Sequence, residues 1–516
     1  MNIGSLLSRN ARFRRDRLAL VFEEKRLTWS ELEARVNRLA NVLLALGLVK
    51  GDRLALVLPN SVQLFEAFLA AARLGIVVVP LSPLLRGSGL SVLLRDSDAC
   101  AVITCFDMAA EIDSIRPQLT KIVPHRYLSI DGPPRDGYRQ YAELTRAASA
   151  DAPPDVEIAG SDPYNIIYSS GTVGLPKGIV HTHDIRALYS VQFASSFRMR
   201  PESVVLHGGS LVFNGAWVML MPWLYLGATY VAMPRFEAAS FIDLIREERA
   251  THMMMVPSQI IAMMSAPNFS AENLRSIEAL CTVGAPLHVR HKEALAAAIP
   301  EVFYELYGLT EGFVTVLDKH DYASKPGSVG CPLPFFEMRI CDSTGHGQGN
   351  DLPPGQVGEI VGRGPLLMPG YYKRPDLTAE AIVDEWLHTG DLGRVDEDGF
   401  LYLVDRKKDL IISGGVNIYP KDIEEIVVQH PAVRESAVFG VPDEKWGEVP
   451  IAAVILNEME TCEASEIRTW VNARVAARYQ QVREVVIMAD FPRSTAGKTL
   501  KRAMREPYWS TSDTAI

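Results

Sequence analysis

Tyr168-Ser169-Ser170-Gly171-Thr172-Val173-Gly174-Leu175-Pro176-Lys177-Gly178 is the stretch on which the fold prediction rests. It follows Asn165-Ile166-Ile167, a short apolar run that predicts a strand. Glycine lets backbone N–H groups approach a ligand closely, successive N–H groups form a concave anion site, and a lysine adds a point charge. This chemistry suits a triphosphate, and the alternative is a flexible Gly/Ser surface loop.

The stretch differs from a Walker-type P-loop, which needs GxxxxGK[ST] at the start of a helix. Gly178 follows Lys177, so no hydroxyl stands there for Mg²⁺. The segment instead resembles the signature loop (YTSGTTGxPKG) of the adenylate-forming superfamily, which includes acyl-CoA synthetases, peptide-synthetase adenylation domains and luciferases. Val173 stands where that loop usually has a second threonine. The resemblance implies that ATP or AMP binds at Ser169, Ser170, Gly171, Thr172, Gly174 and Lys177.

Length and composition limit the class of protein. A chain of 516 residues is too long for one core, so two or more domains are expected. The net charge of −10 argues against nucleic acid as a partner. The six cysteines include no CxxC pair, which indicates neither a disulfide framework nor a zinc site and fits a reducing cytoplasm. We expect a monomer or a homodimer.

The longest uncharged stretch, from about Ser203 to Pro234, could be mistaken for a membrane span. Glycine and proline interrupt it, so it predicts a buried helix over 216–226 and a strand over 229–232, and no membrane span. Further upstream, strands over 53–58 and 76–79 alternate with a helix that begins near Thr28 or Ser30 and a helix over 62–74. This alternation predicts an α/β fold with a largely parallel sheet covered on both faces.

The segment around Phe213-Asn214-Gly215-Ala216-Trp217 is the candidate acid pocket. Peptide-synthetase adenylation domains place an aspartate near this point to pair with the substrate's α-ammonium, and Asn214 is neutral. A buried amide offsets an ammonium poorly, so an α-amino acid is not the expected substrate. Phe213 and Trp217 predict either an aromatic wall of the pocket or plain core. His207, also assigned to this pocket, reads as a structural histidine with satisfied hydrogen bonds and not as a base.

A second motif covers Tyr304-Glu305-Leu306-Tyr307-Gly308-Leu309-Thr310-Glu311. Tyr307 offers a ring for stacking on adenine, Gly308 lets a ligand pass close to the backbone, and Glu311 is an oxygen ligand suited to Mg²⁺. By resemblance, Thr172 and Glu311 share the metal. The nucleotide-binding residues implied here are Gly284, Ala285, Glu305, Leu306, Tyr307, Gly308 and Thr310.

Downstream residues are assigned by the same resemblance. Glycine-punctuated strands form a smaller β-rich subdomain, and Asp391 with Arg406 would bind the ribose hydroxyls, since a carboxylate accepts two hydrogen bonds at once. Residues 1–404 would form a large N-terminal domain, 405–408 a hinge with Lys408 at its pivot, and 409–516 a small, mobile α+β domain. His181 with His183, and His288 with His291, lack acidic or cysteine neighbours at metal spacing.

The small domain carries the remaining predicted sites. Gly414 and Gly415 would let the pantetheine arm of coenzyme A run along bare backbone, and Trp446 resembles the tryptophan that lines this arm in coenzyme A ligases. Where a Tyr-Lys-x-Pro motif is usual, this chain has Tyr479-Gln480-Gln481-Val482, so a basic residue is missing, for which Arg478 or Arg483 could substitute. Lys498, in Phe491-Pro492-Arg493-Ser494-Thr495-Ala496-Gly497-Lys498, matches the family's catalytic lysine.

The resemblance covers essentially the whole chain and implies a two-step ligase. A small carboxylic acid would attack the α-phosphate of ATP, aided by Mg²⁺, and coenzyme A would then displace AMP. The apolar pocket suggests an aromatic, alicyclic or medium-length acid. Two alternatives stay open: another enzyme on the same scaffold, either a luciferase-like oxygenase or a loader of carrier proteins, and a non-catalytic nucleotide-binding protein.

Overall fold

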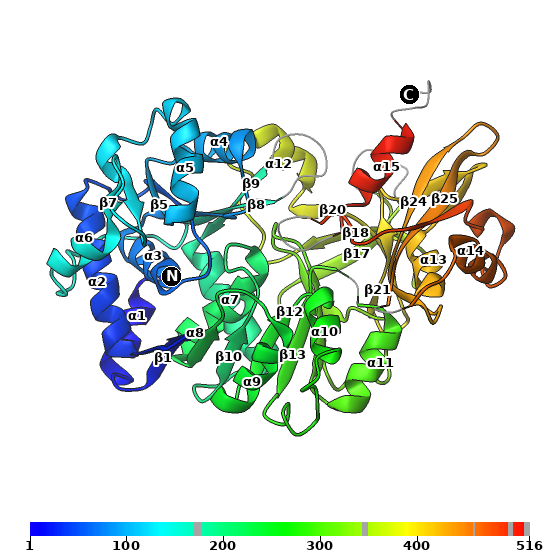
Figure 1. Ribbon diagram of the computed structural model, residues 1–516, viewed down its shortest axis with the longest axis horizontal. Coiled ribbons are helices and arrows are strands. Elements are labelled where there is room, and N and C mark those ends of the chain that lie inside the picture. The colour runs from blue at the N-terminus through cyan, green and yellow to red at the C-terminus, as the bar shows by residue number, and fades with distance from the viewer. Residues whose placement is uncertain (170–176, 286, 343–348, 458–459, 494–498, 510–516) are drawn as a thin grey trace.

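The computed structural model describes residues 1–169, 177–285, 287–342, 349–457, 460–493 and 499–509. Two large sheets with helices around them make up most of the molecule, and a β-rich region leads to a small C-terminal α+β unit at the right of Figure 1. This arrangement confirms the predicted fold class of a mixed α/β protein with a separate C-terminal unit.

The first sheet has seven strands and is parallel except for its last pair. Its apolar central strands are buried on both faces, as the alternating pattern predicts. In spatial order the strands are β7 (Arg139–Gln140), β6 (Tyr127–Ser129), β5 (Ala101–Thr104), β3 (Arg53–Val57), β4 (Val77–Leu81), β8 (Pro163–Ser169) and β9 (Lys177–Thr182).

The second sheet has nine strands, of which the run from β14 to β1 is parallel. Ligands of parallel α/β sheets bind at the carboxyl ends of the strands, which here bring the ends of β13 and β14 side by side. In spatial order the strands are β16 (Cys331–Pro332), β15 (Val314–Leu317), β14 (Phe303–Gly308), β13 (Ala279–Val283), β12 (His252–Met255), β10 (Val204–His207), β11 (Thr229–Ala232), β1 (Leu18–Phe22) and β2 (Lys25–Thr28).

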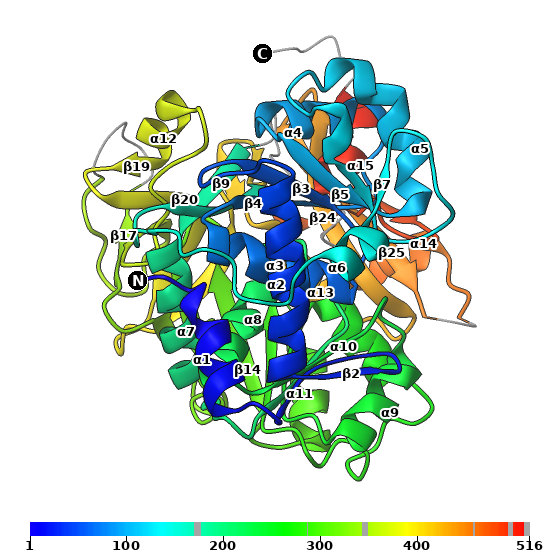
Figure 2. The same ribbon diagram turned by 90° about the vertical axis from the view of Figure 1, so that its left-hand side faces the viewer.

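One hydrophobic core joins the two sheets through the helices that lie between and around them (Figure 2). Thr28 begins α2 with a capping box, in which its hydroxyl accepts from the Glu31 N–H and the Glu31 carboxylate accepts from the Thr28 N–H. Helices of the N-terminal part are α1 (Ser5–Phe13), α2 (Trp29–Ala45), α3 (Val62–Leu74), α4 (Gly87–Asp96), α5 (Phe106–Ile115), α6 (Tyr141–Ala147), α7 (His183–Ser196), α8 (Asn214–Leu226), α9 (Ala238–Glu248), α10 (Pro257–Met264), α11 (Val289–Ala298) and α12 (Pro375–Ala381).

The uncharged stretch that could suggest a membrane span folds as predicted into β10, the buried helix α8 and β11. Pro222 lies inside α8, and Gly227 ends the helix in the left-handed conformation. Within the described ranges of the chain, no helix is both long and apolar enough to cross a membrane.

The β-rich region and the C-terminal unit have sheets of their own. The C-terminal sheet packs its own cores, apart from the main one. The predicted hinge overlaps the end of β21, which reaches Arg406, and a turn occupies 407–409, so the domain limits stay predictions. The remaining elements are β17 (Glu337–Cys341), β18 (Gly358–Arg363), β19 (Ile382–Val383), β20 (Trp386–Val395), β21 (Leu401–Arg406), β22 (Ile411–Ser413), β23 (Val416–Ile418), α13 (Pro420–Val427), β24 (Val433–Asp443), β25 (Gly447–Leu456), α14 (Ala464–Asn472), β26 (Glu484–Ile487) and α15 (Lys501–Trp509).

Candidate active site

The predicted phosphate loop connects two antiparallel neighbours, β8 and β9. Ser169 pairs with Lys177 in this ladder, so the sheet brings both ends of the loop together. Ser170, Gly171, Thr172 and Gly174 lie outside the described residues. The Lys177 ammonium lies 4.7 Å from the centroid of the Tyr371 ring, which is a cation–π contact at the end of the loop.

Tyr371 also joins this lysine to the second motif. Its hydroxyl donates to Glu311 Oε1 at 2.8 Å, and burial raises the Tyr371 pKa, so the phenol stays protonated and acts as the donor. The backbone supports the arrangement, because the Tyr372 N–H donates to the Gly178 carbonyl at 2.7 Å and the Met368 N–H donates to the Glu311 carbonyl at 2.8 Å. Tyr371 therefore holds Lys177 and Glu311 at one site, although the chain separates them widely.

Nucleotide-binding residues were also predicted at the carboxyl ends of β13 and β14. Gly284 and Ala285 are exposed directly after β13, and Val283 pairs with Leu306 of β14. Glu305 and Leu306 are buried, Glu305 forms an ion pair with Lys292 of α11, and both residues lie in β14 between β13 and β15. Their contact with a nucleotide stays a prediction.

Packing within the protein requires a glycine at position 308, because a Cβ atom there would lie only 2.9 Å from the Phe313 carbonyl oxygen. The next residue of the motif with a polar link is Thr310, whose carbonyl accepts a hydrogen bond from His181 Nε2 at 2.8 Å. Both contacts fix the backbone of the motif immediately before Glu311.

The predicted ribose residues lie together at the pairing of β20 and β21. Asp391 is directly opposite Arg406 in this antiparallel ladder, and Arg406 Nε lies 3.4 Å from Asp391 Oδ1. The Tyr307 hydroxyl donates to Asp391 Oδ2 at 2.8 Å, and burial raises the Tyr307 pKa well above its usual value. The structure thus places the predicted adenine and ribose residues next to one another, while their binding of a nucleotide stays a prediction.

Asn214 of the predicted acid pocket faces a buried cation. Arg186 of α7 is fully buried, and its Nη2 donates to Asn214 Oδ1 at 3.0 Å while its Nε donates to Asn165 Oδ1 at 2.8 Å. Arg186 Nη2 also lies 3.2 Å from His181 Nδ1. Burial lowers the Arg186 pKa to about 10, so the guanidinium is charged at neutral pH.

Of the two alternatives for Trp217, packing in the core is the one that its contacts match. The ring is fully buried, 4.8 Å from the Phe68 ring and 5.7 Å from the Tyr164 ring, and the Arg186 guanidinium stacks on it at 4.5 Å. Phe213 is only partly buried, at the N-cap of α8. The pocket prediction therefore rests on the partly buried Phe213 and Asn214 and not on Trp217.

His207 is buried, as expected for a structural histidine. Burial lowers its pKa to about 4, against hydrogen bonds with the backbone of Gly209 and Ser210, so the ring is neutral at physiological pH. Its assignment to the acid pocket stays a prediction.

The residues predicted to contact coenzyme A lie together in the C-terminal unit. The Gly414 N–H donates to the Trp446 carbonyl at 2.7 Å, and a Cβ atom on Gly414, whose φ is 57°, would lie 2.8 Å from the Trp446 ring. Gly415 is exposed, and a Cβ atom there would meet no described atom within 4 Å. Trp446 is half-exposed. This face is open in the present arrangement, and its role stays a prediction.

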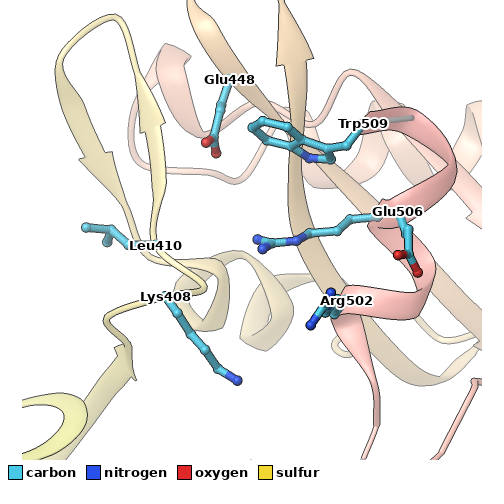
Figure 3. A pocket seen from close by; sticks show the side chains of 7 residues that line it. Lys408, Leu410, Glu448, Arg502, Glu506 and Trp509 are labelled. Carbon is cyan, nitrogen blue, oxygen red and sulfur yellow. The ribbon is translucent and has the colours of Figure 1, made fainter. Parts of the chain in front are cut away.

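Lys408, the predicted pivot, borders a pocket of about 370 Å³ between the turn and α15 (Figure 3). Desolvation at the edge of this pocket, followed by the charge of Arg406, lowers the pKa of the exposed Lys408 side chain to about 8. Lys498 lies outside the described residues. The pocket is lined by Lys408, Leu410, Glu448, Arg502, Arg505, Glu506 and Trp509.

The two predicted metal ligands come from different parts of the chain. Thr172 lies outside the described residues, and Glu311 offers carboxylate oxygens, which suit a hard cation, one of them accepting from Tyr371. The described part of the chain contains no group of three or more His, Cys, Asp or Glu side chains that could hold a metal ion by itself. His288, which has no acidic neighbour in sequence, lies 3.2 Å from Glu425 of the C-terminal unit.

Two site residues escaped sequence reasoning. Tyr371 follows a glycine in a run that predicts only the end of a strand, and Arg186 is a single arginine in a stretch of mixed polarity. No sequence signal singles out Arg186, because its role depends on partners from β8, β9 and α8.

Comparisons with known proteins agree along the whole chain. The model of the AMP-binding enzyme family matches residues 7–372, and that of the AMP-binding enzyme C-terminal domain matches residues 422–498. A long-chain-fatty-acid–CoA ligase of Mycobacterium tuberculosis is 36% identical over 494 residues, 94% of each chain. A feruloyl-CoA synthase of an Amycolatopsis species is 33% identical over 518 residues, 98% of this chain and 99% of the relative.

Among solved structures, ATP-bound MatB from Rhodopseudomonas palustris superposes with a TM-score of 0.88 at 30% identity, covering 98% of this chain and 99% of that one.

Proposed function

The chain belongs to the AMP-binding enzyme family and is an ATP-dependent acyl-CoA ligase, and on that premise we propose that it activates an aromatic, alicyclic or medium-length carboxylic acid. The acid is first joined to AMP with release of pyrophosphate, and the acyl group then passes to coenzyme A with release of AMP. Relatives named for long-chain fatty acids and for ferulate support an apolar acid.

One observation carries the residue assignment: Tyr371 contacts both Lys177 and Glu311. The first half-reaction brings a carboxylate against a phosphate, so the enzyme must position two anions and neutralise the charge that develops. Lys177 supplies a fixed cation at the end of the phosphate loop. Mg²⁺, when bound at Glu311, neutralises phosphate charge.

Asp391, Arg406 and Tyr307 orient the nucleoside in this proposal. The Asp391 carboxylate can accept from two ribose hydroxyls, and Arg406 and Tyr307 fix its orientation. Lys498 bridges the acid and the α-phosphate during adenylation. The Gly414–Gly415 turn and Trp446 guide the coenzyme A thiol toward the adenylate in the second half-reaction.

The test is a panel of acids with ATP, Mg²⁺ and coenzyme A, in which pyrophosphate release and thioester formation are measured in parallel. The panel contains acetate, octanoate, palmitate, cyclohexanecarboxylate, benzoate and ferulate. We expect both products with at least one of octanoate, cyclohexanecarboxylate, benzoate and ferulate, at a higher kcat/KM than with acetate. Pyrophosphate without thioester would favour a carrier protein as acceptor, and neither product with any acid would overturn the proposal.

A further inference from the structure

Arg186 is a buried cation without an acidic partner. Its side chain is fully buried, and among the described residues its Nη1 has no hydrogen-bond partner and no carboxylate pairs with it. All of its hydrogen-bond partners, on Asn165, His181 and Asn214, are uncharged. Most buried charges are paired, because transfer of a charge out of water is costly. An unpaired guanidinium in this place therefore calls for an explanation.

The neighbours of Arg186 do not cancel its charge. The Trp217 and Tyr189 rings lie 4.5 Å and 4.7 Å from its guanidinium and stabilise it only through cation–π contacts. Burial, followed by the charge of Arg186, lowers the His181 pKa well below its usual value, so this ring is neutral. Its Nε2 donates to the Thr310 carbonyl, which leaves Nδ1 to accept from Arg186. One net positive charge remains.

On the assignment of Asn214 to the acid pocket, this residue separates the Arg186 charge from the substrate. Its Oδ1 accepts from Arg186 at 3.0 Å, its Nδ2 donates to the Tyr189 hydroxyl at 3.1 Å, and its side chain is only partly buried. An aspartate at this position would form an ion pair with Arg186 and would not be available to a ligand. On the same assignment, Arg186 places a positive potential next to the acid through its hydrogen bond to Asn214.

Resting on the function proposed above, we propose that Arg186 is a specificity-determining residue. Its buried charge, behind Asn214, admits carboxylic acids whose α-carbon carries hydrogen or an uncharged group and rejects those with an α-ammonium. The same charge attracts the substrate carboxylate. The substrate class is therefore carboxylic acids without a cationic α-substituent.

The experiment varies the charge at this place in steps. The wild type has a charge of +1, Arg186→Lys keeps it, Arg186→Met and Asn214→Asp each bring it to zero, and the double variant Arg186→Met/Asn214→Asp brings it to −1. The probes are 3-phenylpropanoate, 3-phenyllactate and phenylalanine, which carry H, OH and NH₃⁺ on the α-carbon. If the wild type does not use the phenyl series, octanoate with its 2-hydroxy and 2-amino forms replaces it. The measurement is kcat/KM of acid-dependent ATP–pyrophosphate exchange.

We expect the amino-to-hydroxy ratio of kcat/KM to rise by about ten-fold for each unit of positive charge removed, as two charges several ångströms apart in a protein would give. Arg186→Lys should keep the wild-type ratio, and Arg186→Met should raise KM for the α-unsubstituted acid more than it lowers kcat. The double variant should exceed Asn214→Asp, because in the single variant Arg186 neutralises the new carboxylate.

Equal ratios in the wild type, Asn214→Asp and the double variant would overturn the inference, as would an Asn214→Asp variant that accepts the amino acid as well as the double variant does. If Arg186→Met does not fold, Asn214→Asp and Arg186→Lys still test the inference. Asn214→Asp lowers the net charge at this place and should raise the amino-to-hydroxy ratio, whereas Arg186→Lys keeps the charge and should leave the ratio unchanged. A wild type that exchanges with no acid at all would refute the proposed function instead.

Discussion

The hydroxyl of Tyr371 is the smallest group in the site whose removal isolates one contact. Tyr371→Phe keeps the ring beneath Lys177 but deletes the hydrogen bond to Glu311. A hydrogen bond to a charged group contributes about 1.5–3 kcal/mol. We expect a roughly ten-fold higher Mg²⁺ concentration for half-maximal pyrophosphate release, with a thermal midpoint lowered by about a few degrees at most.

Tyr372→Phe is the matched control, since the neighbouring phenol donates to Asp98, away from the site. Its Mg²⁺ dependence should equal that of the wild type. An identical shift in both variants would mean that the effect comes from packing and not from Glu311.

Glu311→Gln should have a larger effect than Tyr371→Phe, because it removes a charged oxygen ligand from the proposed metal site. Adenylation at limiting Mg²⁺ should slow while the fold, checked by circular dichroism, stays intact. Unchanged rates at limiting Mg²⁺ would remove Glu311 from the metal site.

At this scale the sequence predicts residues that lie in long motifs and misses those that act from outside them. Lys177 and Glu311 could be named because glycine, hydroxyl and charge occur together at fixed spacing. Tyr371 could not, because a tyrosine after a glycine has the same pattern in any strand end. Arg186 could not either, since its missing acidic partner becomes visible only when β8, β9 and α8 have assembled around α7.

At the scale of elements, α11 connects the N-terminal part to the C-terminal unit. Arg290 donates through Nη1 to the carbonyl of Val428, the C-cap residue of α13, and through Nη2 to the carbonyls of Val433 and Arg434 at 2.9 and 3.0 Å. We expect Arg290→Met to loosen this contact, since helix-end carbonyls lose a charged donor. Limited proteolysis near residues 405–409 should become several-fold faster.

Arg275→Met is the control for this experiment, because Arg275 makes only an exposed ion pair with Glu272. Its proteolysis rate should match that of the wild type. If Arg290→Met is cleaved no faster than this control, α11 does not hold the C-terminal unit.

Elements were predicted well where local signals agree. The Thr28 cap, the helix over 62–74 and the strands beside it follow from capping residues and apolar periodicity alone. The burial of Trp217 could not be chosen over a pocket wall, because the helix α8 is apolar on all sides and gives no preferred face. The face was decided by Phe68 and Arg186, which come from other helices.

At the scale of the whole molecule, the two half-reactions should separate. We expect Lys498→Ala to slow adenylation by about a hundred-fold or more, because a charged donor to the developing phosphate charge is lost. It should still convert supplied acyl-adenylate and coenzyme A into thioester. Lys408→Pro should do the reverse, since proline fixes φ at the pivot and prevents rotation. Pyrophosphate and thioester are measured for each variant, and equal loss of both steps in both variants would contradict domain rotation.

Asp405 should make the position of the C-terminal unit depend on pH. Its Oδ2 accepts from the Lys421 N–H in the first turn of α13 at 3.1 Å. Burial raises the Asp405 pKa to about 6. The charge of Lys501 opposes this increase, and the charge of Glu424 adds to it. A raised pKa in the docked state favours docking at low pH, and this contribution is lost as pH rises from about 4 through 6. We expect up to about a ten-fold larger undocked fraction at pH 7 than at pH 5, after allowance for solvent screening.

Fluorophores on the two parts would report this fraction by energy transfer. Asp405→Asn should abolish most of the pH dependence. Glu425 has a pKa that burial raises but His288 lowers further, so it favours docking at high pH. Glu425 is present in both the wild type and Asp405→Asn, so the difference between their pH profiles is due to Asp405. A variant with the wild-type pH profile would show that another group is responsible.

The pairing of Asp391 with Arg406 has one more consequence, because Arg406 is the last residue of β21 and the pivot follows two positions later. On the proposed assignment, the same short segment holds the ribose and sets the angle of the C-terminal unit. A nucleotide that binds one angle more tightly must shift the balance of angles by the same factor, and a change at the pivot must return that factor as a change in nucleotide affinity. Product AMP would then hold the C-terminal unit at the angle of the last turnover, and the unit would return to the adenylation angle only after AMP dissociates.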